Sequence, residues 1–552
     1  MTKATILSVT NPSERGDKKQ LGNLPGAALP MAIAELAKQH ASHSLLVVPD
    51  PQIALKLQAE IEQFTDQPVS LFPDWETLPY DNFSPHQEII SDRIARLYQL
   101  PNQRSGVTIV PVSTILQRQS PRDFLLQHTL MVKTGDQFSL EKLRTQLDNS
   151  GYRHVDQVFG PGEYASRGSI LDLFPMGSSD PYRIDFFDDE IDTIRTFDPE
   201  NQRSIDDIQQ IQLLPAHEFP TTKEAIEDFR TRWRTQFEAR REPESIYMQV
   251  TKGTWPAGIE YWQPLFFEHT ETLFDYLPDD SQLIVYGDIE AAVDTFLNDV
   301  DYRYDQKKID PLRPLLAPHE LWLKKDELFK QIKQLPQALL SLDKVVKRAG
   351  RQNLAVQSLA ELGVQQQNKE PLSRLRQFSE QFTGKIVFSV ESEGRREALT
   401  ELLQGIKIRP VVHESIYQAL DSKDRFSLIL GAAEHGFIHE ELNFALICES
   451  DLLGDRVIQR RRKDKKTVNS DTVIRHLAEL KPGQPVVHID HGIGRYIGLQ
   501  TLEAGGMKTE YVTLEYQNDA KLYVPVSSLN LISRYSGGAE ESAPLHKLGG
   551  EA

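Results

Sequence analysis

The feature that most constrains the fold is the repeated pairing of a short apolar run with a helical pattern. Ser44–Val48 is apolar throughout and has the length of a buried strand, and apolar residues then recur at helical spacing over 53–64. A second helical pattern at 89–100 is followed by a second apolar run at 107–112. Strands that alternate with helices predict a parallel sheet covered by helices.

The alternation of strand and helix patterns stops near residue 129 and resumes near 216. Short β-type runs at 169–174 and Tyr182–Phe187 are separated by the turn residues 177–181, which indicates a small β-rich insertion. Residues from about 216 to 340 return to an α/β pattern with long helical stretches. Lys385–Val390 then begins a second α/β unit, which has a helix near 395–403 and later strands at Phe426–Leu430 and Phe444–Cys448.

The last unit is predicted to be β again. Apolar residues alternate with polar ones on both sides of the turn at 517–520, at Val512, Leu514, Tyr516, Leu522, Val524 and Val526. This pattern is typical of a hairpin. Together with residues 486–498 it predicts a small, strongly bent sheet or barrel.

Composition narrows the class of protein. The 552 residues suffice for three to five domains, and 80 acidic against 62 basic residues disfavour DNA as the chief partner. The lone Cys448 excludes an internal disulfide and a cysteine-rich zinc site. With no apolar signal-peptide core in residues 1–22 and no apolar run near the ~20 residues that span a bilayer, a cytoplasmic protein is predicted. The loop-like C-terminal stretch leads us to expect the front part of a longer protein.

No catalytic residue and no metal ligand is predicted. A phosphate-binding loop ends in Gly-Lys-Ser/Thr, whereas the nearest candidate, residues 22–29, keeps two glycines but lacks the lysine and the hydroxyl. The sequence Asp188-Asp189-Glu190 is interpreted as a polar turn rather than a magnesium site, and Asp288 with Glu290 as an ordinary strand end. His488 and His491 would face opposite sides of a strand and have no cysteine nearby.

One candidate docking face comes from alternation in Tyr182–Phe187. Tyr182, Ile184 and Phe186 share the apolar side, so Arg183, Asp185 and Phe187 share the other side. Aromatic residues and arginine are enriched in interface hot spots, and Arg167 in a preceding loop could join this face. The alternative is that another domain covers Phe187.

A second candidate face lies in residues 496–503. Leu499 and Leu502 differ in parity, so one of them must face away from the local core if the strand is regular. An exposed apolar residue on an edge strand invites pairing with a partner's strand. The alternative is a covering linker.

The segment 456–466 carries seven basic residues and one acid, Asp464. It could bind phosphates, but a solvated tether between domains is the favoured interpretation.

The chain resembles the N-terminal half of the bacterial transcription-repair coupling factor family over essentially its whole length. The strings that carry the resemblance are 75–81, 183–191, 431–436, 488–496 and 521–526. The resemblance implies a multidomain α/β plus β protein. Its parts are a degenerate P-loop-like α/β module similar to the excinuclease component UvrB (1–128 and 216–345), an inserted β-rich domain (129–215), a family-specific α/β domain of unassigned role (350–454), a basic linker (455–474) and a tudor-like β-barrel (475–548).

The resemblance also implies partners. The inserted domain is expected to bind the excinuclease component UvrA through positions matching Arg167, Arg183 and Phe187, with Asp185 on the same face. The barrel is expected to bind the RNA polymerase β subunit through the strand that contains Leu499 and Leu502, where Leu502 is the favoured contact. The flanking polymerase-binding candidates are Tyr496, Thr501 and Glu503.

The function expected from these features is that of a non-catalytic adaptor in transcription-coupled nucleotide excision repair. The ATP- and magnesium-dependent DNA translocase of the family lies beyond the barrel, so no cofactor is expected in this chain. In the intact family protein the distal end is thought to mask the repair-binding face, so this chain should bind its repair partner constitutively. The alternatives are a nucleotide-dependent DNA-remodelling enzyme and a DNA-binding module that uses 456–466.

Overall fold

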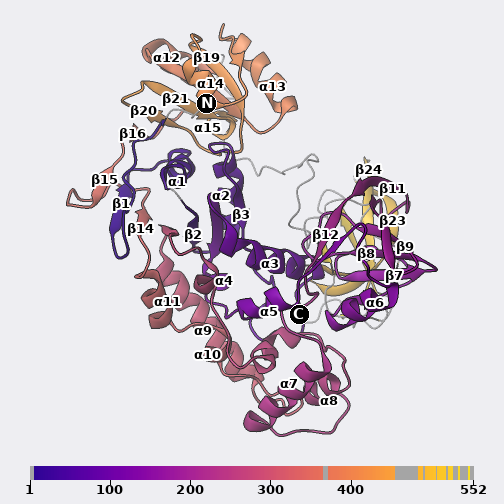
Figure 1. The fold of residues 1–552 in the computed structure, drawn as a ribbon. Coiled ribbons are helices and arrows are strands. Elements are labelled where there is room, and N and C mark those ends of the chain that lie inside the picture. Colours follow the sequence, from indigo (N-terminus) through magenta and orange to yellow (C-terminus); the bar gives the residue numbers. More distant parts are fainter. Residues whose placement is uncertain are drawn as a thin grey trace.

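The structure is a computed structural model. It describes residues 5–40, 42–364, 371–453, 483–488, 491–504, 507–517, 520–525, 532–534 and 545–546. In these residues the chain forms several sheets, each with its own covering helices or its own small core (Figure 1).

The first domain is built on a seven-stranded sheet in which every neighbouring pair is parallel. Its strands come from both ends of the first 353 residues, so the insertion interrupts a single folding unit. In spatial order they are β15 (Arg351–Asn353), β1 (Lys18–Gly22), β14 (Gln337–Leu340), β13 (Gln282–Tyr286), β2 (Ser44–Val48), β4 (Val107–Pro111) and β3 (Val69–Leu71).

The central strand β2 is apolar throughout because both of its faces are covered. Leu45 and Val47 enter one hydrophobic core, and Leu46 and Val48 enter another. The first core includes residues of α3 (Gln87–Gln99), α4 (Val112–Ile115) and α9 (Ile289–Lys307), and the second includes residues of α1 (Ala28–Gln39) and α2 (Pro51–Glu62). The parallel sheet covered by helices that the sequence predicts is therefore confirmed.

A mostly helical part extends from this sheet, in purple (α5) and magenta to pink (the other elements) in Figure 1. It packs an aromatic-rich continuation of the first core. Its elements are α5 (Arg122–Gln127), α7 (Lys223–Gln236), α8 (Ile246–Thr251), η2 (Ile259–Phe266), η3 (Leu273–Tyr276), α10 (Pro318–Leu321) and α11 (Lys325–Ile332). Among the described residues, no helix has the length and apolar character needed to cross a bilayer.

The chain enters and leaves the inserted β-rich domain through a two-stranded antiparallel ribbon, which β5 (Leu130–Lys133) and β12 (Gln210–Leu213) form. Between them lie α6 (Leu140–Asn149) and a six-stranded sheet. In spatial order its strands are β11 (Ser204–Ile208), β10 (Glu190–Phe197), β9 (Tyr182–Phe187), β8 (Ile170–Phe174), β7 (Glu163–Arg167) and β6 (Arg153–His154). The pairs from β7 to β11 are antiparallel, and β6 is parallel to β7.

A buried ion pair anchors the exit from this insertion to the first domain. Arg93 of α3 donates through Nε to Glu218 Oε1 at 2.8 Å, and both side chains are buried. The other oxygen of Glu218 accepts from Trp75 Nε1 at 2.9 Å, and Arg93 also donates to Pro73 O and to Gln119 Oε1. Because the donors and acceptors of the pair are satisfied, the charges can be buried at this junction.

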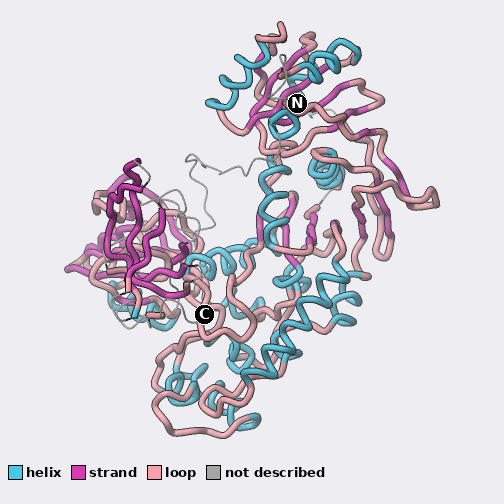
Figure 2. The backbone as a smooth tube through the Cα atoms, turned by 180° about the vertical axis from the view of Figure 1, so that it is seen from behind, coloured by secondary structure: helices cyan, strands magenta, loops and turns pink. Residues whose placement is uncertain are grey.

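The second α/β domain has a six-stranded sheet that packs against α1 and α2 of the first domain (Figure 2). In spatial order its strands are β16 (Val356–Gln357), β20 (Phe437–His439), β21 (Phe444–Cys448), β17 (Lys385–Val390), β19 (Phe426–Leu430) and β18 (Val411–Val412). The last four strands in this order are parallel, and the first three form antiparallel pairs. The helices are α12 (Ser373–Gln381), α13 (Glu393–Gln404), α14 (Ile416–Asp421) and α15 (Glu449–Leu453).

The C-terminal unit is an antiparallel five-stranded sheet with its own small core. In spatial order its strands are β25 (Lys521–Pro525), β24 (Met507–Glu515), β23 (Gly492–Ala504), β22 (Pro485–His488) and β26 (Ile532–Arg534). The expected hairpin is present, since Val512 pairs with Val524 and Leu514 pairs with Leu522. Alternate residues of this hairpin fill the core, as the period-2 pattern predicts.

The multidomain α/β plus β class predicted from the sequence is confirmed at the level of these sheets. Five predicted strands match β2, β9, β17, β19 and β21 residue for residue. The strand predicted at 107–112 ends one residue earlier, at Pro111, because Val112 already begins α4. The basic segment 456–466 and Val526 lie outside the described residues.

Candidate docking faces and a closed phosphate loop

Residues 22–29 lie where a nucleotide-binding loop would lie, between the first strand of a parallel sheet and the helix that follows it. Asn23 adopts a left-handed backbone conformation with φ 63°, and its amide group donates to the carbonyl oxygens of Leu354 (2.9 Å) and Val356 (2.7 Å). The loop is therefore held by the connection into the second α/β domain rather than left open for a ligand.

The second α/β domain also closes the N-terminus of α1. The backbone N–H of Ala27 donates to the carbonyl oxygen of His435 at 2.7 Å. A Cβ atom at Gly26, which has φ +52°, would lie 2.6 Å from the carbonyl oxygens of both His435 and Gly436. Free N–H groups at a helix N-terminus are what bind phosphate anions, and here a carbonyl oxygen of the chain itself is the acceptor. Sequence reasoning did not foresee this closure, because His435 is about 400 residues away along the chain.

The acidic residues considered as metal ligands have structural roles. Asp288 caps α9 by accepting from the Ala291 N–H at 3.0 Å, and Glu290 forms an ion pair with Lys325 at 3.0 Å. Asp188 begins the turn between β9 and β10 with φ 53°. The interpretations as strand end and polar turn are confirmed. Among the described residues, no group of three or more His, Cys, Asp or Glu side chains is arranged to hold a metal ion.

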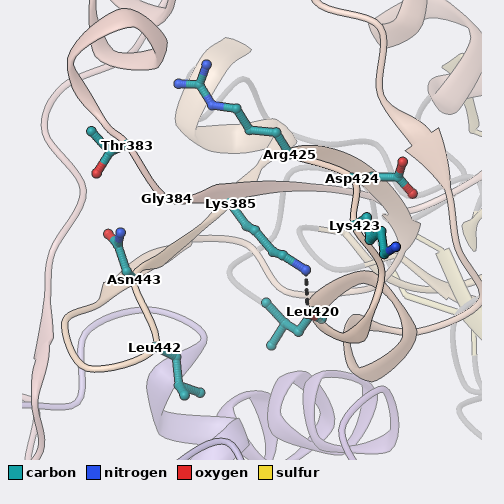
Figure 3. A pocket seen from close by; sticks show the side chains of 9 residues that line it. All are labelled: Thr383, Gly384, Lys385, Leu420, Lys423, Asp424, Arg425, Leu442 and Asn443. Atoms are coloured by element: carbon teal, nitrogen blue, oxygen red, sulfur yellow. Dashed lines mark hydrogen bonds between the residues drawn. The ribbon is translucent and has the colours of Figure 1, made fainter.

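The second α/β domain has a cavity of about 480 Å³ at the end of its sheet where β17 begins (Figure 3). Lys385 in this cavity donates to the carbonyl oxygens of Leu420 (2.5 Å) and Ser422, at the C-terminal end of α14. Figure 3 shows Arg425 directed away from Lys385. Lys385 is bound to backbone carbonyl oxygens and Arg425 points elsewhere, so these two cations do not form an anion site in this cavity.

The inserted sheet presents the face that the sequence predicts. Ile184 and Phe186 are buried in the first core, whereas the Phe187 side chain, which points to the opposite side, is 72% exposed. The alternative interpretation, that another domain covers Phe187, is therefore wrong for the described part of the chain. We call the side of this sheet that carries Arg183, Asp185 and Phe187 the outer face.

Arg183 is used inside the domain. Its guanidinium forms a two-pronged contact with Asp172 of the neighbouring strand β8, with Nε to Oδ1 at 2.7 Å and Nη2 to Oδ2 at 2.8 Å. Its Nη1 donates to Gln202 O, and the group stacks over Phe197 at 4.9 Å from the ring centroid. The hydrogen bonds to Asp172 raise the pKa of Arg183 above its ordinary value. Sequence reasoning missed Asp172, whose signal was a single acid between two leucines of an apolar strand.

Asp185 is paired as well. Its carboxylate accepts from Arg195 of β10 and, at 3.0 Å, from the hydroxyl of Thr193. Much of the predicted charged surface is therefore neutralised within the sheet, through the pairs Arg183–Asp172 and Arg195–Asp185.

Arg167 joins the outer face, as expected, but the expectation that it lies in a loop is wrong, because it is the last residue of strand β7. It pairs with Ile170, which in turn pairs with Asp185 on β9, so these three residues stand in one row across the sheet. Its side chain is exposed, and Nη2 donates to Asp156 O at 2.7 Å. The structure thus brings Arg167, Asp185 and Phe187 onto one face, and Phe187 is the most exposed of the aromatic residues there.

The second candidate face lies along β23. Tyr496 is 5% exposed and belongs to the core of the C-terminal sheet, so the expectation that it is a surface contact is wrong. The reason is that Tyr496 pairs with the core residue Leu514 of β24, and a register shift between Tyr496 and Gly498 then puts Leu499 opposite the core residue Val512. Leu499 is 43% exposed.

The ladder then continues without a further shift to Leu502, which pairs with Thr509. The backbone positions of Leu499 and Leu502 therefore lie on opposite sides of β23, as their spacing predicts. The side chains of Thr501, Leu502 and Glu503 lie outside what the structure describes, so their roles remain predictions.

Comparison with known proteins places these features in context. Three family models match the chain: a UvrB interaction domain over 130–219, an MFD D3 domain over 378–452 and a CarD-like/TRCF RID domain over 480–536. The first match covers the inserted sheet, the second covers most of the second α/β domain, and the third covers the C-terminal sheet.

Full-length relatives match nearly the whole chain. It is 57% identical over 545 residues to a transcription-repair-coupling factor of Escherichia coli (strain K12), covering 98% of this chain and 47% of the relative. Proteins of the same name are 52% identical in Haemophilus influenzae and 26% identical in Bacillus subtilis (strain 168), each covering 98% of this chain and 47% of the relative. The chain spans about half the length of these curated relatives.

Proposed function

Because this chain corresponds to the N-terminal region of transcription-repair-coupling factors, we propose that it acts as an adaptor with two separate docking faces. The outer face of the inserted sheet recruits the excinuclease component UvrA. The strand β23 of the C-terminal sheet grips the β subunit of RNA polymerase. Recruitment of a nucleotide excision repair protein to stalled transcription then requires no chemistry from this chain, and the cytoplasm, where both partners act, is its expected location.

The observation that carries the proposal is the exposure of Phe187. Phe187 ends β9 on a charged sheet face with its side chain 72% exposed, and such contact between an aromatic ring and water is unfavourable unless a partner covers the ring. The short strand β9 holds its backbone in place between β8 and β10, so little entropy is lost when a partner binds. A UvrB interaction domain matches the same residues, which supports the excinuclease component UvrA as the partner.

For the polymerase-binding strand we propose Leu502 as the central apolar contact. Leu499, Thr501 and Glu503 flank it along β23 and, by alternation, lie on the other side of the strand. The CarD-like match over 480–536 supports this assignment. Tyr496 supports the strand from inside the core and makes no contact with the partner.

We further propose that the first domain is a P-loop-type module that has lost nucleotide binding, and that the C-terminal sheet is a tudor-like barrel. The absence of lysine and hydroxyl groups from residues 22–29 supports the first proposal, as does the carbonyl oxygen of His435 at the Ala27 N–H. ATP and magnesium then belong to a motor outside this chain, and no ATP hydrolysis by this chain is expected.

The test is a two-partner binding assay with purified RNA polymerase β and UvrA. Phe187→Ala is preferable to a change at Arg183, because removing Arg183 would leave Asp172 unpaired and disturb the sheet. Phe187→Ala should weaken binding of UvrA at least tenfold, about 1.4 kcal/mol, and leave polymerase binding unchanged. Leu502→Arg should have the reverse effect, because a charge in an apolar contact is costly to desolvate.

Ile309→Ala is the matched control, since Ile309 is 82% exposed and lies on neither face. Loss of both activities in either variant, or of neither in both variants, would contradict two independent docking faces. Unchanged circular dichroism of each variant shows that it is folded.

A further inference from the structure

The loop that connects β14 to β15 is basic, although the chain as a whole is acidic. Its ten residues 342–351 include four lysine or arginine residues and a single acid, Asp343, whereas the whole chain has 80 acidic and 62 basic residues. Figure 1 shows this loop beside β15, the edge strand of the first domain's sheet. The neighbouring strand β1 begins with another basic residue. We call these five residues the basic edge: Lys18, Lys344, Lys347, Arg348 and Arg351.

Backbone contacts hold the loop against β1 and β15. Near its start, the carbonyl oxygen of Asp343 accepts from the N–H of Asn23 at 2.9 Å. Near its end, the carbonyl oxygen of Gly350 accepts from the N–H of Gln20 at 2.8 Å. Between these points, a side-chain amide of β15 binds the N–H of Val345 at 2.7 Å and its carbonyl oxygen at 2.8 Å. Because the loop contributes only backbone groups to these contacts, its basic side chains can be replaced without removing them.

The cations of the basic edge are free to act on a partner. All five residues are exposed, and their side chains have no hydrogen-bond or ion-pair partner among the described residues. Lys18 and Arg351 share one side of the sheet, because Arg351 pairs with Gln20, two residues after Lys18. At 0.1 M salt, exposed charges within about 10 Å of each other act together on an approaching ion. Such a group attracts a polyanion without needing fixed side-chain directions.

The basic edge has the length of a short row of phosphates. From Lys18 to Asn23 the strand β1 and its extension advance five residues, or about 16 Å. The loop follows this length, since it is bound at Asn23 and at Gln20. One strand of duplex DNA carries a phosphate every 3.4 Å or so along the helix axis, so about five phosphates lie within this length.

The composition of the basic edge favours a duplex over a single strand. Proteins hold single-stranded nucleic acids largely by stacking bases on aromatic side chains. Residues 17–22 and 341–353 contain no aromatic side chain. Lysine and arginine alone contact phosphates, which a duplex presents along its whole outer surface.

We propose that the basic edge binds the phosphate backbone of duplex DNA without reading its sequence. This contact goes beyond the two docking faces, because neither UvrA nor RNA polymerase takes part in it. The net charge of −18 disfavours close approach of DNA to most of the surface, so the contact is local. It is also weak and sensitive to salt, and it holds the first domain against DNA while the docking faces bind their own partners.

The test measures binding of the full chain to a fluorescein-labelled DNA duplex by anisotropy, from about 50 to about 200 mM salt. The loop variant combines Lys344→Gln, Lys347→Gln and Arg348→Gln. The control variant removes the same charge at three exposed lysines of other elements, by Lys142→Gln, Lys223→Gln and Lys252→Gln. Unchanged thermal midpoints show that both variants are folded.

The loop variant should bind the duplex at least tenfold more weakly at the lowest salt, and the control variant should bind within twofold of wild type. Each phosphate contact adds about −0.9 to the slope of log affinity against log salt. Five contacts in the wild type and two in the loop variant therefore predict slopes of about −4.5 and about −1.8. A second duplex of unrelated sequence should give the same affinities, because phosphates carry no sequence information.

Four outcomes would overturn the inference. They are no binding of the duplex by the wild type at the lowest salt, equal affinities of the wild type and the loop variant, equal weakening in the two variants, and tighter binding of a single strand than of the duplex. Displacement of the duplex by polyglutamate at equal charge concentration would overturn it as well, since the basic edge would then suit an acidic protein. The proposed function does not depend on these results, because the assay contains neither UvrA nor RNA polymerase.

Discussion

Glu260 should make the stability of the first domain fall as the pH rises through neutrality. Its carboxyl group is buried beneath the loop that carries Ser84, whose hydroxyl donates to Glu260 Oε2 at 2.8 Å. Burial raises the pKa of Glu260 from 4.5 to about 7, and the nearby Glu218 acts in the same direction. The folded chain therefore holds a proton on Glu260 that the unfolded chain releases near pH 4.5.

The magnitude follows from the two pKa values. The difference between the two pKa values corresponds to about 3 kcal/mol of stability, which is present below pH 4.5 and is lost as the pH rises through about 7. Between pH 5.5 and 8.5 this linkage should lower the free energy of unfolding by about 2 kcal/mol. Glu260→Gln keeps an acceptor for Ser84 but carries no proton to lose, so it should lack this part of the pH dependence.

The assay compares wild type and Glu260→Gln by urea unfolding from pH 5.5 to 8.5, followed by tryptophan fluorescence, because Trp262 lies in the same helix η2. Other titrating groups contribute equally to both proteins and cancel in the difference. A difference that changes by less than about 0.5 kcal/mol over this range would refute the assignment of a buried, protonated Glu260.

Three further outcomes are expected. Glu218→Ala should lower the free energy of unfolding by about 3–5 kcal/mol, because it leaves the Arg93 charge buried and unpaired. The double change Arg93→Met with Glu218→Leu should lower it by less than Glu218→Ala does, and urea unfolding measures both variants. Gly26→Val should loosen the joint between the two α/β domains, since its Cβ would meet the His435 carbonyl at 2.6 Å, and faster hydrogen exchange in α1 would show this. Burial lowers the pKa of His217 to about 4, so the folded chain keeps His217 neutral and its stability should fall as the pH drops from about 7 towards 4. His217→Phe should reduce this loss of stability in thermal unfolding, and the same loss in the variant as in the wild type would contradict the prediction.

The amino-acid sequence by itself determined the elements and their exposed sides. Ser44–Val48 is a strand covered on both faces because five consecutive residues have no charged side to present to water. Phe187 points outward because side chains alternate along a strand whose other side is needed for the core. The lack of a lysine in residues 22–29 argues against a triphosphate site before any coordinates are seen.

Only the tertiary structure decided which groups are free to act. Arg183 and Asp185 lie on the predicted face, but their partners Asp172 and Arg195 come from neighbouring strands, whose register local patterns do not specify. Tyr496 lies in the core because it pairs with the core residue Leu514, and the register shift that follows puts Leu499 opposite the core residue Val512, which parity along the strand does not reveal.

The loop at residues 22–29 shows the same limit at longer range. The His435 carbonyl reaches the Ala27 N–H only because two separate domains pack against each other. The spacing of apolar residues along a strand or helix predicts which side chains are buried. Which distant atom occupies a given position follows from packing between elements, and that information is spread over the whole chain.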